Sequence, residues 1–123
     1  MGFVFTQYTN CGASTEEIFF MTDQRIIAGT VKSTGEIISG DGFSVSRVSK
    51  GHYQVSFRPA FSSIGGASVT QIYPSDGNTR DNAVIISLDV NGVYVKTGDS
   101  GGDATDRNFT FVAVGSGSQT AAV

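Results

Sequence analysis

Between residues 25 and 115 the chain is a continuous series of short apolar–polar alternations separated by turns, with no convincing helix among them. Each alternation ends at a cluster of Gly, Asn, Asp or Ser, the residues that favour tight turns. A period of two places one face of a strand in a core and the other in solvent. Because 123 residues suffice for one such core, we predict a single-domain, all-β protein with an antiparallel, jelly-roll-like β-sandwich.

The strand pattern is clearest before Pro59, where Tyr53, Val55 and Phe57 alternate with polar residues. Proline cannot donate to a central ladder and should end this strand. The alternation fails at Arg47-Val48, which predicts a β-bulge. Other strands are predicted at residues 25–31, 36–39, 67–73 and 108–114. The two sheets are expected to close over Tyr53, Val55, Phe57, Ile86, Leu88, Phe109 and Phe111.

The pair Asn91-Gly92 predicts a hairpin between residues 82 and 97. This pair is favoured in two-residue type I′ turns, in which both positions need φ > 0. A turn at this pair sets Val90 opposite Val93 and Leu88 opposite Val95. The residues expected on its core face are then Ile86, Leu88, Val90, Val93 and Val95.

Both ends of the chain differ from this pattern. Residues 1–24, which include Phe3, Phe5, Phe19 and Phe20, are interpreted as an N-terminal arm, residues 25–115 as the sandwich and residues 116–123 as a flexible tail. The start lacks a basic stretch followed by a sustained apolar run, so we predict no Sec signal peptide. No stretch approaches the roughly eighteen apolar residues of a spanning helix, so we predict no membrane insertion.

Charge and rare residues exclude several classes of function. The net charge is −3, and the eight Lys and Arg residues are scattered from Arg25 to Arg107. Nucleic-acid backbones need clustered cations, so we predict no nucleic-acid partner. Cys11 is the only cysteine and can form no internal disulfide. His52 is the only histidine, and a zinc site needs more ligands than His52 and Cys11.

The segment Gly98-Asp99-Ser100-Gly101-Gly102 spells the sequence around the nucleophile of trypsin-like serine proteases. That chemistry needs a serine activated by an oriented imidazole. The family's proline after the second glycine is replaced by Asp103, and His52 lacks the Ala-Ala-His-Cys setting of the family. The protease fold also needs nearly twice this length. The segment is therefore interpreted as a turn, and we predict that the protein is not an enzyme.

Two loops are rich in side-chain oxygens. Asp76, Asn78, Asp81 and Asn82 lie in one, and the other holds Asp99, Asp103 and Asp106. Ca²⁺ prefers about six to eight oxygen ligands, which the two loops could supply together at one end of a sandwich. Asp and Asn also favour turns for local backbone reasons, and neither loop matches the EF-hand pattern. We predict no cofactor, with Ca²⁺ as the open alternative.

A set of glycine turns and core aromatics carries a family resemblance. Its segments are Gly29-Thr30-Val31, Gly40-Asp41-Gly42-Phe43-Ser44-Val45, Gly51-His52-Tyr53-Gln54-Val55-Ser56-Phe57, Pro59-Ala60-Phe61-Ser62-Ser63 and Phe109-Thr110-Phe111-Val112-Ala113-Val114-Gly115. The series resembles the small β-sandwich modules at the C-termini of bacteriophage tail fibres and of bacterial collagen-like surface proteins. Those modules commonly have a proline after the Phe-Ser-Ser stretch, where this chain has Ile64-Gly65-Gly66.

The resemblance implies a homotrimer that recognises a cell-surface glycan or receptor through loops at its exposed end, located on a virion or at a cell surface. It transfers no binding residue position by position. From the loop residues themselves we predict ligand contacts by Tyr73, Asp76, Asn78, Arg80, Asp81, Tyr94, Asp99 and Asp103. Such contacts would be non-covalent, with aromatic faces on sugar C–H surfaces and polar groups on hydroxyls. The alternative is a structural trimerisation domain without a specific ligand, which would explain the apolar arm.

Overall fold

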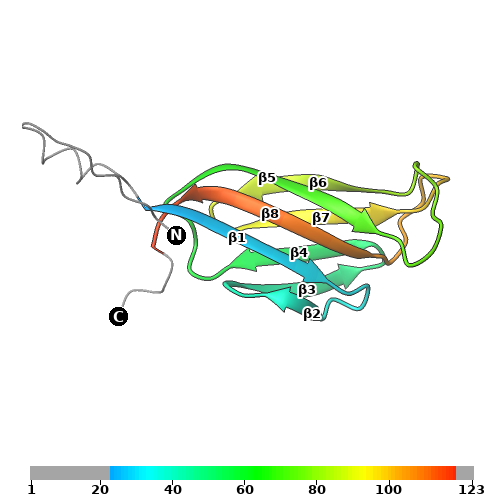
Figure 1. Cartoon of the computed structure of the whole chain (residues 1–123), viewed down its shortest axis with the longest axis horizontal. Helices are drawn as coiled ribbons and strands as arrows, with labels where there is room; N and C mark the ends of the chain where they lie inside the picture. Colours follow the sequence, from blue (N-terminus) through cyan, green and yellow to red (C-terminus); the bar gives the residue numbers. More distant parts are fainter. Residues whose placement is uncertain (1–22, 119–123) are drawn as a thin grey trace, which may run out of the picture.

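The computed structural model describes residues 23–118, which form eight strands in two antiparallel sheets (Figure 1). The strands are β1 (Gln24–Val31), β2 (Ile37–Gly40), β3 (Phe43–Ser49), β4 (His52–Phe57), β5 (Ser63–Ile72), β6 (Asn82–Asp89), β7 (Gly92–Gly98) and β8 (Asn108–Ser116). One sheet has the order β2-β1-β8-β5 and the other β3-β4-β7-β6. No helix occurs in the described part of the chain. The predicted all-β, antiparallel sandwich is confirmed. The predicted arm, residues 1–24, lies outside the described residues except for its last two.

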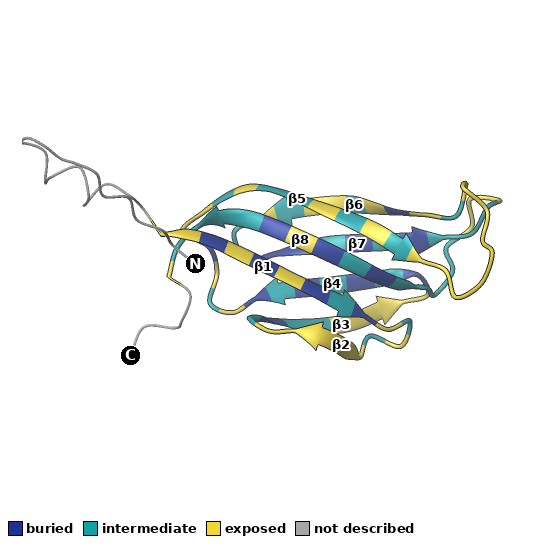
Figure 2. Ribbon diagram, in the orientation of Figure 1, coloured by how far each residue is buried: buried dark blue, intermediate teal, exposed yellow. Residues whose placement is uncertain are grey.

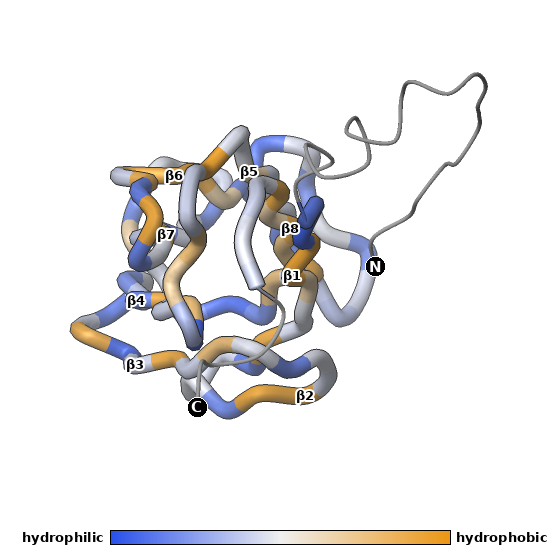
Figure 3. The backbone as a smooth tube through the Cα atoms, turned by 90° about the vertical axis from the view of Figure 1, so that its left-hand side faces the viewer, coloured by the Kyte–Doolittle hydropathy of each residue, from blue (hydrophilic) through white to orange (hydrophobic). Residues whose placement is uncertain are grey.

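The two sheets are separate layers when viewed along the strands (Figure 3). Buried residues alternate with mostly exposed ones along β1 and with half-buried ones along β4, as Figure 2 shows. Aromatic rings join the layers: Tyr53 lies 5.1 Å from Phe109 and Phe43 lies 4.8 Å from Phe111 between ring centroids. The buried apolar residues are Ile27, Val31, Phe43, Tyr53, Val55, Phe57, Phe61, Ala83, Val93, Val95, Phe109, Phe111 and Ala113.

Most strand predictions are confirmed, with shifted ends. β4 ends at Phe57, before Pro59, and the β3–β4 register shifts between Arg47 and Ser49, as the predicted bulge requires. β5 begins earlier than predicted and β8 runs later, because Ser63 pairs with Ser116. Their hydroxyl oxygens are 2.7 Å apart. Ser116, predicted to begin the tail, is therefore the last residue of a strand.

The predicted register of the β6–β7 hairpin is wrong. Asp89 pairs with Gly92, so the two turn residues are Val90 and Asn91 rather than Asn91 and Gly92. The register also shifts between Ile85 and Ser87. Ile86, expected in the core, is consequently 52% exposed.

Contacts from outside the hairpin explain this register. The Val90 and Asn91 carbonyl oxygens accept hydrogen bonds from the backbone N–H groups of Phe61 and Phe57, at 2.9 and 2.8 Å. Gly92 lies so close to β4 that a Cβ there would come within 2.2 Å of the Val55 carbonyl oxygen. The glycine is thus needed for a close approach between strands, not for φ > 0 in a turn.

Gly92→Ala should destabilise the fold by about 1–3 kcal/mol, because the methyl group overlaps the β4 backbone. Gly66→Ala is the matched control: it also lies in a strand, and an added Cβ there meets nothing within 4 Å. The control should change the free energy of unfolding by about 0.5 kcal/mol or less. Urea denaturation of both variants measures the difference, and equal costs would contradict the close approach.

Candidate functional site

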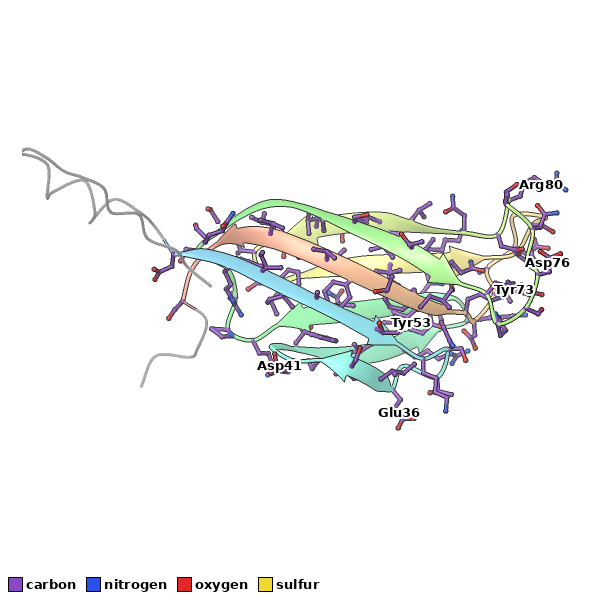
Figure 4. All side chains as sticks on the ribbon, in the orientation of Figure 1. Glu36, Asp41, Tyr53, Tyr73, Asp76 and Arg80 are labelled. Carbon is purple, nitrogen blue, oxygen red and sulfur yellow. The ribbon has the colours of Figure 1, made fainter. Side chains whose placement is uncertain are left out.

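Most of the predicted binding residues lie at one end of the sandwich, here called the loop end (Figures 1 and 4). It consists of the β5–β6 loop, residues 73–81, and the β7–β8 loop, residues 99–107. The opposite end, called the terminal end, is where β1 begins and β8 finishes. The expectation that the two acidic loops meet at one end of the sandwich is confirmed.

Arg107 joins the two loops. Its Nη1 donates to Gln71 Oε1 at 3.0 Å and lies 3.3 Å from Asp81 Oδ1. Its guanidinium carbon lies 4.6 Å from the centroid of the Tyr73 ring, a cation–π arrangement. The Asp81 carboxylate and the Arg107 guanidinium are both largely shielded from solvent, at 9% and 16% exposure of the side chains. Arg107 is therefore a fixed part of the site, and Tyr73 is held beside it.

Two of the predicted ligand residues hold their own loop in place. Asp81 Oδ2 accepts the Asn78 backbone N–H at 2.8 Å, and Asn78 Oδ1 accepts the Arg80 backbone N–H at 2.8 Å. The Asp81 N–H returns a hydrogen bond to the Asn78 carbonyl oxygen. Such side-chain to backbone bonds are the usual use of Asp and Asn in turns.

Asp99 has the same role in the other loop. Its Oδ1 accepts the backbone N–H groups of Gly101 and Asp103, at 2.9 and 3.0 Å. The hydrogen bond from Asp103, followed by that from Gly101, lowers the pKa of the Asp99 carboxyl. The Gly98-Asp99-Ser100-Gly101-Gly102 segment is thus built as a turn around a carboxylate.

The other predicted ligand residues are dispersed. Asp76, Arg80 and Asp103 are exposed at the loop end, and their side chains make no hydrogen bond within residues 23–118. Tyr94 does not belong to the loop end. Its neighbours Val93 and Val95 point into the core, so Tyr94 points outward from the other sheet, 5.9 Å from the His52 ring.

Within residues 23–118, His52 and the acidic loops form neither a metal-binding cluster nor a Ser-His-Asp catalytic triad. The His52 Nδ1 atom lies 2.8 Å from the Lys50 carbonyl oxygen, and no hydrogen bond joins its ring to Ser100. No group of three or more His, Cys, Asp or Glu side chains in residues 23–118 is placed to hold a metal ion. The absence of a cofactor, with calcium as the alternative, stays a prediction.

Asp106 holds the loop end to the sandwich. Its carboxylate accepts hydrogen bonds from Gly51 N–H at 2.7 Å and Tyr53 O–H at 3.3 Å, and it pairs with the Arg47 guanidinium at 2.9 Å. The Arg47 hydrogen bond is the main cause that lowers the pKa of Asp106. Tyr53 is fully buried, which raises the pKa of its phenol, and its single hydroxyl proton is shared between Asp106 and the Ser33 carbonyl oxygen, which lies closer at 2.7 Å.

A depression of about 280 Å³ opens beside these anchors. Its wall includes the Tyr73 ring, whose side chain Figure 4 shows at the loop end. The lining residues are Ser33, Tyr73, Pro74, Asp106, Arg107 and Asn108. This volume lies just below the range for small-molecule sites, roughly 300–1,000 Å³.

Several donors around the depression are not used within the fold. The Ser33 and Tyr73 hydroxyls, the Asn108 amide nitrogen, and Nε and Nη2 of Arg107 make no hydrogen bond within residues 23–118. An aromatic face and a few convergent polar groups are the usual makeup of a ligand site. The lining of the depression is thus chemically suited to a small polar ligand that also has an apolar surface.

Of the residues that line the depression, the sequence predicts only Tyr73 as a contact to the saccharide. In the sequence Asp106 is one of the oxygens of the calcium alternative, and Arg107 is one of several scattered cations. The available signal is that Arg107 is the one cation in a loop otherwise charged by Asp99, Asp103 and Asp106. A single arginine among several carboxylates is expected to form an ion pair with one of them, and such a pair can connect two loops.

No protein-family model matches the chain, and searches of the curated proteins and of the solved structures give no match. Within residues 23–118 there is also no helix that is long and apolar enough to cross a membrane.

Asp106→Asn should lower the free energy of unfolding at pH 7 by about 1–2 kcal/mol, because it removes the charge from hydrogen bonds made by Arg47, Gly51 and Tyr53. The Asp106 pKa is lower in the folded than in the unfolded state. Its stabilising effect is therefore complete above the unfolded value of about 3.9 and is lost as the pH falls through the folded value.

Urea denaturation between pH 7 and pH 2.5 tests this expectation. The difference in the free energy of unfolding between the native protein and Asp106→Asn should shrink as the pH falls below about 4. Protonation then removes the charge of the native Asp106 carboxyl, as the substitution by Asn does at every pH. Asp41→Asn, at an exposed position that makes no hydrogen bond with its side chain in the described region, should leave stability at pH 7 unchanged. A pH-independent difference for Asp106→Asn would contradict the role of its charge.

Proposed function

We propose that the protein is a non-catalytic binding module for a cell-surface saccharide, and that the depression at the loop end is its binding site. The observation that carries the proposal is the combination of the Tyr73 ring with unused donors of Ser33, Arg107 and Asn108 around one cavity. A sugar has hydroxyl groups at its rim and C–H groups on its faces, so it needs both kinds of contact. The cavity size suits a single sugar ring better than a long chain.

Each lining group has a defined part in this binding. The Tyr73 ring and Pro74 would contact the C–H face of the sugar, while Arg107 and Asn108 donate to its hydroxyl oxygens. The Asp106 carboxylate is an acceptor for hydroxyl protons. Arg107 is already paired with Asp81, so a neutral ligand leaves no charge unbalanced at this point. The proposal therefore favours a neutral saccharide over an acidic one.

The loops are prepared for a ligand before it arrives. Asp81, Asn78 and Asp99 close their loops by internal hydrogen bonds, and Arg107 joins the loops to each other. Binding to loops that are already ordered costs less conformational entropy than binding to loops that must be ordered. The loop end would therefore bind a ligand without first having to order these loops.

Tyr73→Ala should weaken saccharide binding roughly fivefold, or about 1 kcal/mol, because stacking on the ring is lost. Tyr94→Ala is the matched control, since Tyr94 lies on the outer face of sheet β3-β4-β7-β6, away from the depression. A glycan array identifies the saccharide, and titration calorimetry then compares the variants. Silence of the folded native protein across bacterial and host glycans would contradict the proposal, as would equal losses in the two variants.

We further propose that copies of the chain assemble, as in the trimeric fibre tips that the sequence resembles, through the outer face of sheet β2-β1-β8-β5. The outward positions of its three longest strands carry no charged side chain. They are Gln24, Ile26, Ala28 and Thr30 of β1, Asn108, Thr110, Val112, Val114 and Ser116 of β8, and Gly66, Ser68, Thr70 and Ile72 of β5. Depletion of charge is typical of the centre of a protein interface.

Both outer faces expose apolar residues, but only the other sheet also places charge among them. On that sheet His52 pairs with Lys96, and Lys96 pairs with Val84. On sheet β2-β1-β8-β5, Ile26 and Val112 are 50% and 42% exposed with no charged outward neighbour on β1, β8 or β5. This assembly is also the alternative function: if no ligand binds, the module would serve trimerisation alone.

Val112→Lys should dissociate the assembly, because it introduces an unpaired charge at the centre of this face. Ile86→Lys is the matched control, since Ile86 is 52% exposed on sheet β3-β4-β7-β6 and Val112 is 42% exposed. Light scattering should give a trimer mass for the native protein and Ile86→Lys, and a monomer mass for Val112→Lys. A monomeric native protein would contradict the assembly proposal and leave the saccharide proposal to its own test.

A further inference from the structure

Gln71, near the end of β5, connects the two sheets at the loop end. Its side-chain nitrogen Nε2 donates to the Asn82 carbonyl oxygen of β6 at 2.6 Å and to the Gly98 carbonyl oxygen of β7 at 2.9 Å. Carbonyl oxygens only accept and a guanidinium only donates, so the reverse orientation of this amide would leave all of these contacts without a hydrogen bond. The Gln71 oxygen Oε1 is therefore held toward Arg107.

The contacts of Arg107 fix its guanidinium on one side. Its Nη1 has two protons, and two acceptors lie at that nitrogen, Gln71 Oε1 at 3.0 Å and Asp81 Oδ1 at 3.3 Å. The guanidinium carbon lies over the Tyr73 ring, 4.6 Å from its centroid. Because a guanidinium is planar and rigid, holding Nη1 and the central carbon also restricts where the other two nitrogens lie.

The remaining side of the guanidinium is the edge formed by Nε and Nη2. The Nε–H and one Nη2–H point in the same direction along this edge, and neither nitrogen makes a hydrogen bond within residues 23–118. The Arg107 side chain is largely shielded from solvent, and it lines the depression. The depression is therefore where a ligand can reach this edge.

Two parallel donors fit two acceptor atoms that lie side by side. On a neutral sugar such a pair is formed by hydroxyl oxygens on adjacent ring carbons, provided that the two are not both axial. A carboxylate also offers two oxygens, but Asp81 already pairs with Arg107, and the Asp106 carboxylate lines the same depression. A ligand carboxylate would be repelled by both. The chemistry of the depression thus favours the hydroxyl pair.

We propose that Arg107 is the specificity-determining residue of the depression, with its Nε–Nη2 edge binding two adjacent hydroxyl oxygens of one sugar ring, and that Gln71 is the positioning residue that holds this edge in place. The inference rests on the proposed saccharide site and states what that site selects. Adjacent hydroxyls are most often both present on the terminal sugar of a chain, because an internal sugar uses further hydroxyls for its linkages. The site would therefore recognise chain ends.

Titration calorimetry with simple sugars tests the role of Arg107. The probes are the methyl glycosides of glucose, galactose, mannose and fucose, and deoxy analogues that each lack one hydroxyl of an adjacent pair. At least one methyl glycoside should bind, and one of its deoxy analogues should bind roughly tenfold more weakly, as for loss of a hydrogen bond to a charged group.

Arg107→Lys keeps the charge but lacks the paired donors. It should bind the intact methyl glycoside roughly tenfold more weakly and no longer distinguish it from that deoxy analogue. Arg58→Lys is the matched control, because Arg58 Nε donates to Ser44 Oγ at 2.9 Å and does not line the depression. This control should keep both the affinity and the discrimination of the native protein.

Gln71→Met tests the positioning role and should also remove the discrimination. Gln54→Met is its matched control, since the Gln54 amide likewise donates to two carbonyl oxygens, those of Val55 and Val93, without contacting Arg107. If Gln71→Met does not fold, the NMR spectrum of the native protein supplies the readout. The Nε–H signal of Arg107, identified by its loss in Arg107→Lys, should shift on addition of the methyl glycoside and not of the deoxy analogue.

The outcomes separate this inference from the proposed function. Equal binding of a methyl glycoside and all its deoxy analogues would overturn the inference and leave the saccharide site in place, as would discrimination retained in Arg107→Lys or Gln71→Met. Tighter binding of methyl glucuronide than of methyl glucoside would also overturn it, because the edge would then be a carboxylate site. Failure of all four glycosides despite a positive glycan array would do the same. Silence in both experiments would contradict the proposed function itself.

Discussion

The Asp106 carboxylate is the interaction on which the loop end depends. It accepts hydrogen bonds from Gly51 in the β3–β4 turn and from Tyr53 in β4, and it pairs with Arg47 of β3. The Tyr53 hydroxyl proton is shared with the Ser33 carbonyl oxygen in the β1–β2 turn. One side chain therefore joins three connections that are distant in the sequence. Because Arg107 and Asn108 follow Asp106 directly, the same anchor also sets the positions of the two donors at the depression.

The loop end divides its polar side chains between two tasks. Asn78, Asp81 and Asp99 satisfy backbone N–H groups of their own loops, so the residues that look most like ligands in the sequence are largely occupied. The groups with unused hydrogen-bonding capacity come from the edges of the loops and from a neighbouring turn. In the candidate site, the side chains that are hydrogen-bonded within the fold set the shape of the loops. The side chains with unused donors are the ones available to a ligand.

The strands could be predicted because the alternation of apolar and polar residues along a strand can be read from a few neighbouring residues. This holds for β4, for the bulge at Arg47-Val48 and for most of the core. The β6–β7 register could not be predicted, because backbone donors of Phe57 and Phe61 and the close approach of Gly92 to Val55 determine it. These contacts join residues far apart in the chain, and they prevailed over the local preference of Asn-Gly for a type I′ turn.

The candidate site was predicted only in part, because local patterns indicate loops but not their partners in the fold. Composition identified the two acidic loops, and the antiparallel topology brings them to one end of the sandwich. Arg107 and Asn108 were missed because their roles follow from partners such as Asp81 and Ser33, which only the fold brings near. Tyr94, also predicted as a ligand contact, does not belong to the loop end. Its register on β7 points it outward from sheet β3-β4-β7-β6.

The loop end lies opposite the end of the sandwich at which β1 begins and β8 finishes, and this has a consequence for display. β8 has nine residues and spans about 30 Å at the usual strand rise. The backbone therefore enters β1 and leaves β8 about that far from the depression and on the other side of the core. Several copies attached at that end of the sandwich would all point their depressions away from the attachment, and under the proposed saccharide binding weak individual contacts would add up to strong avidity on a surface rich in identical sugars.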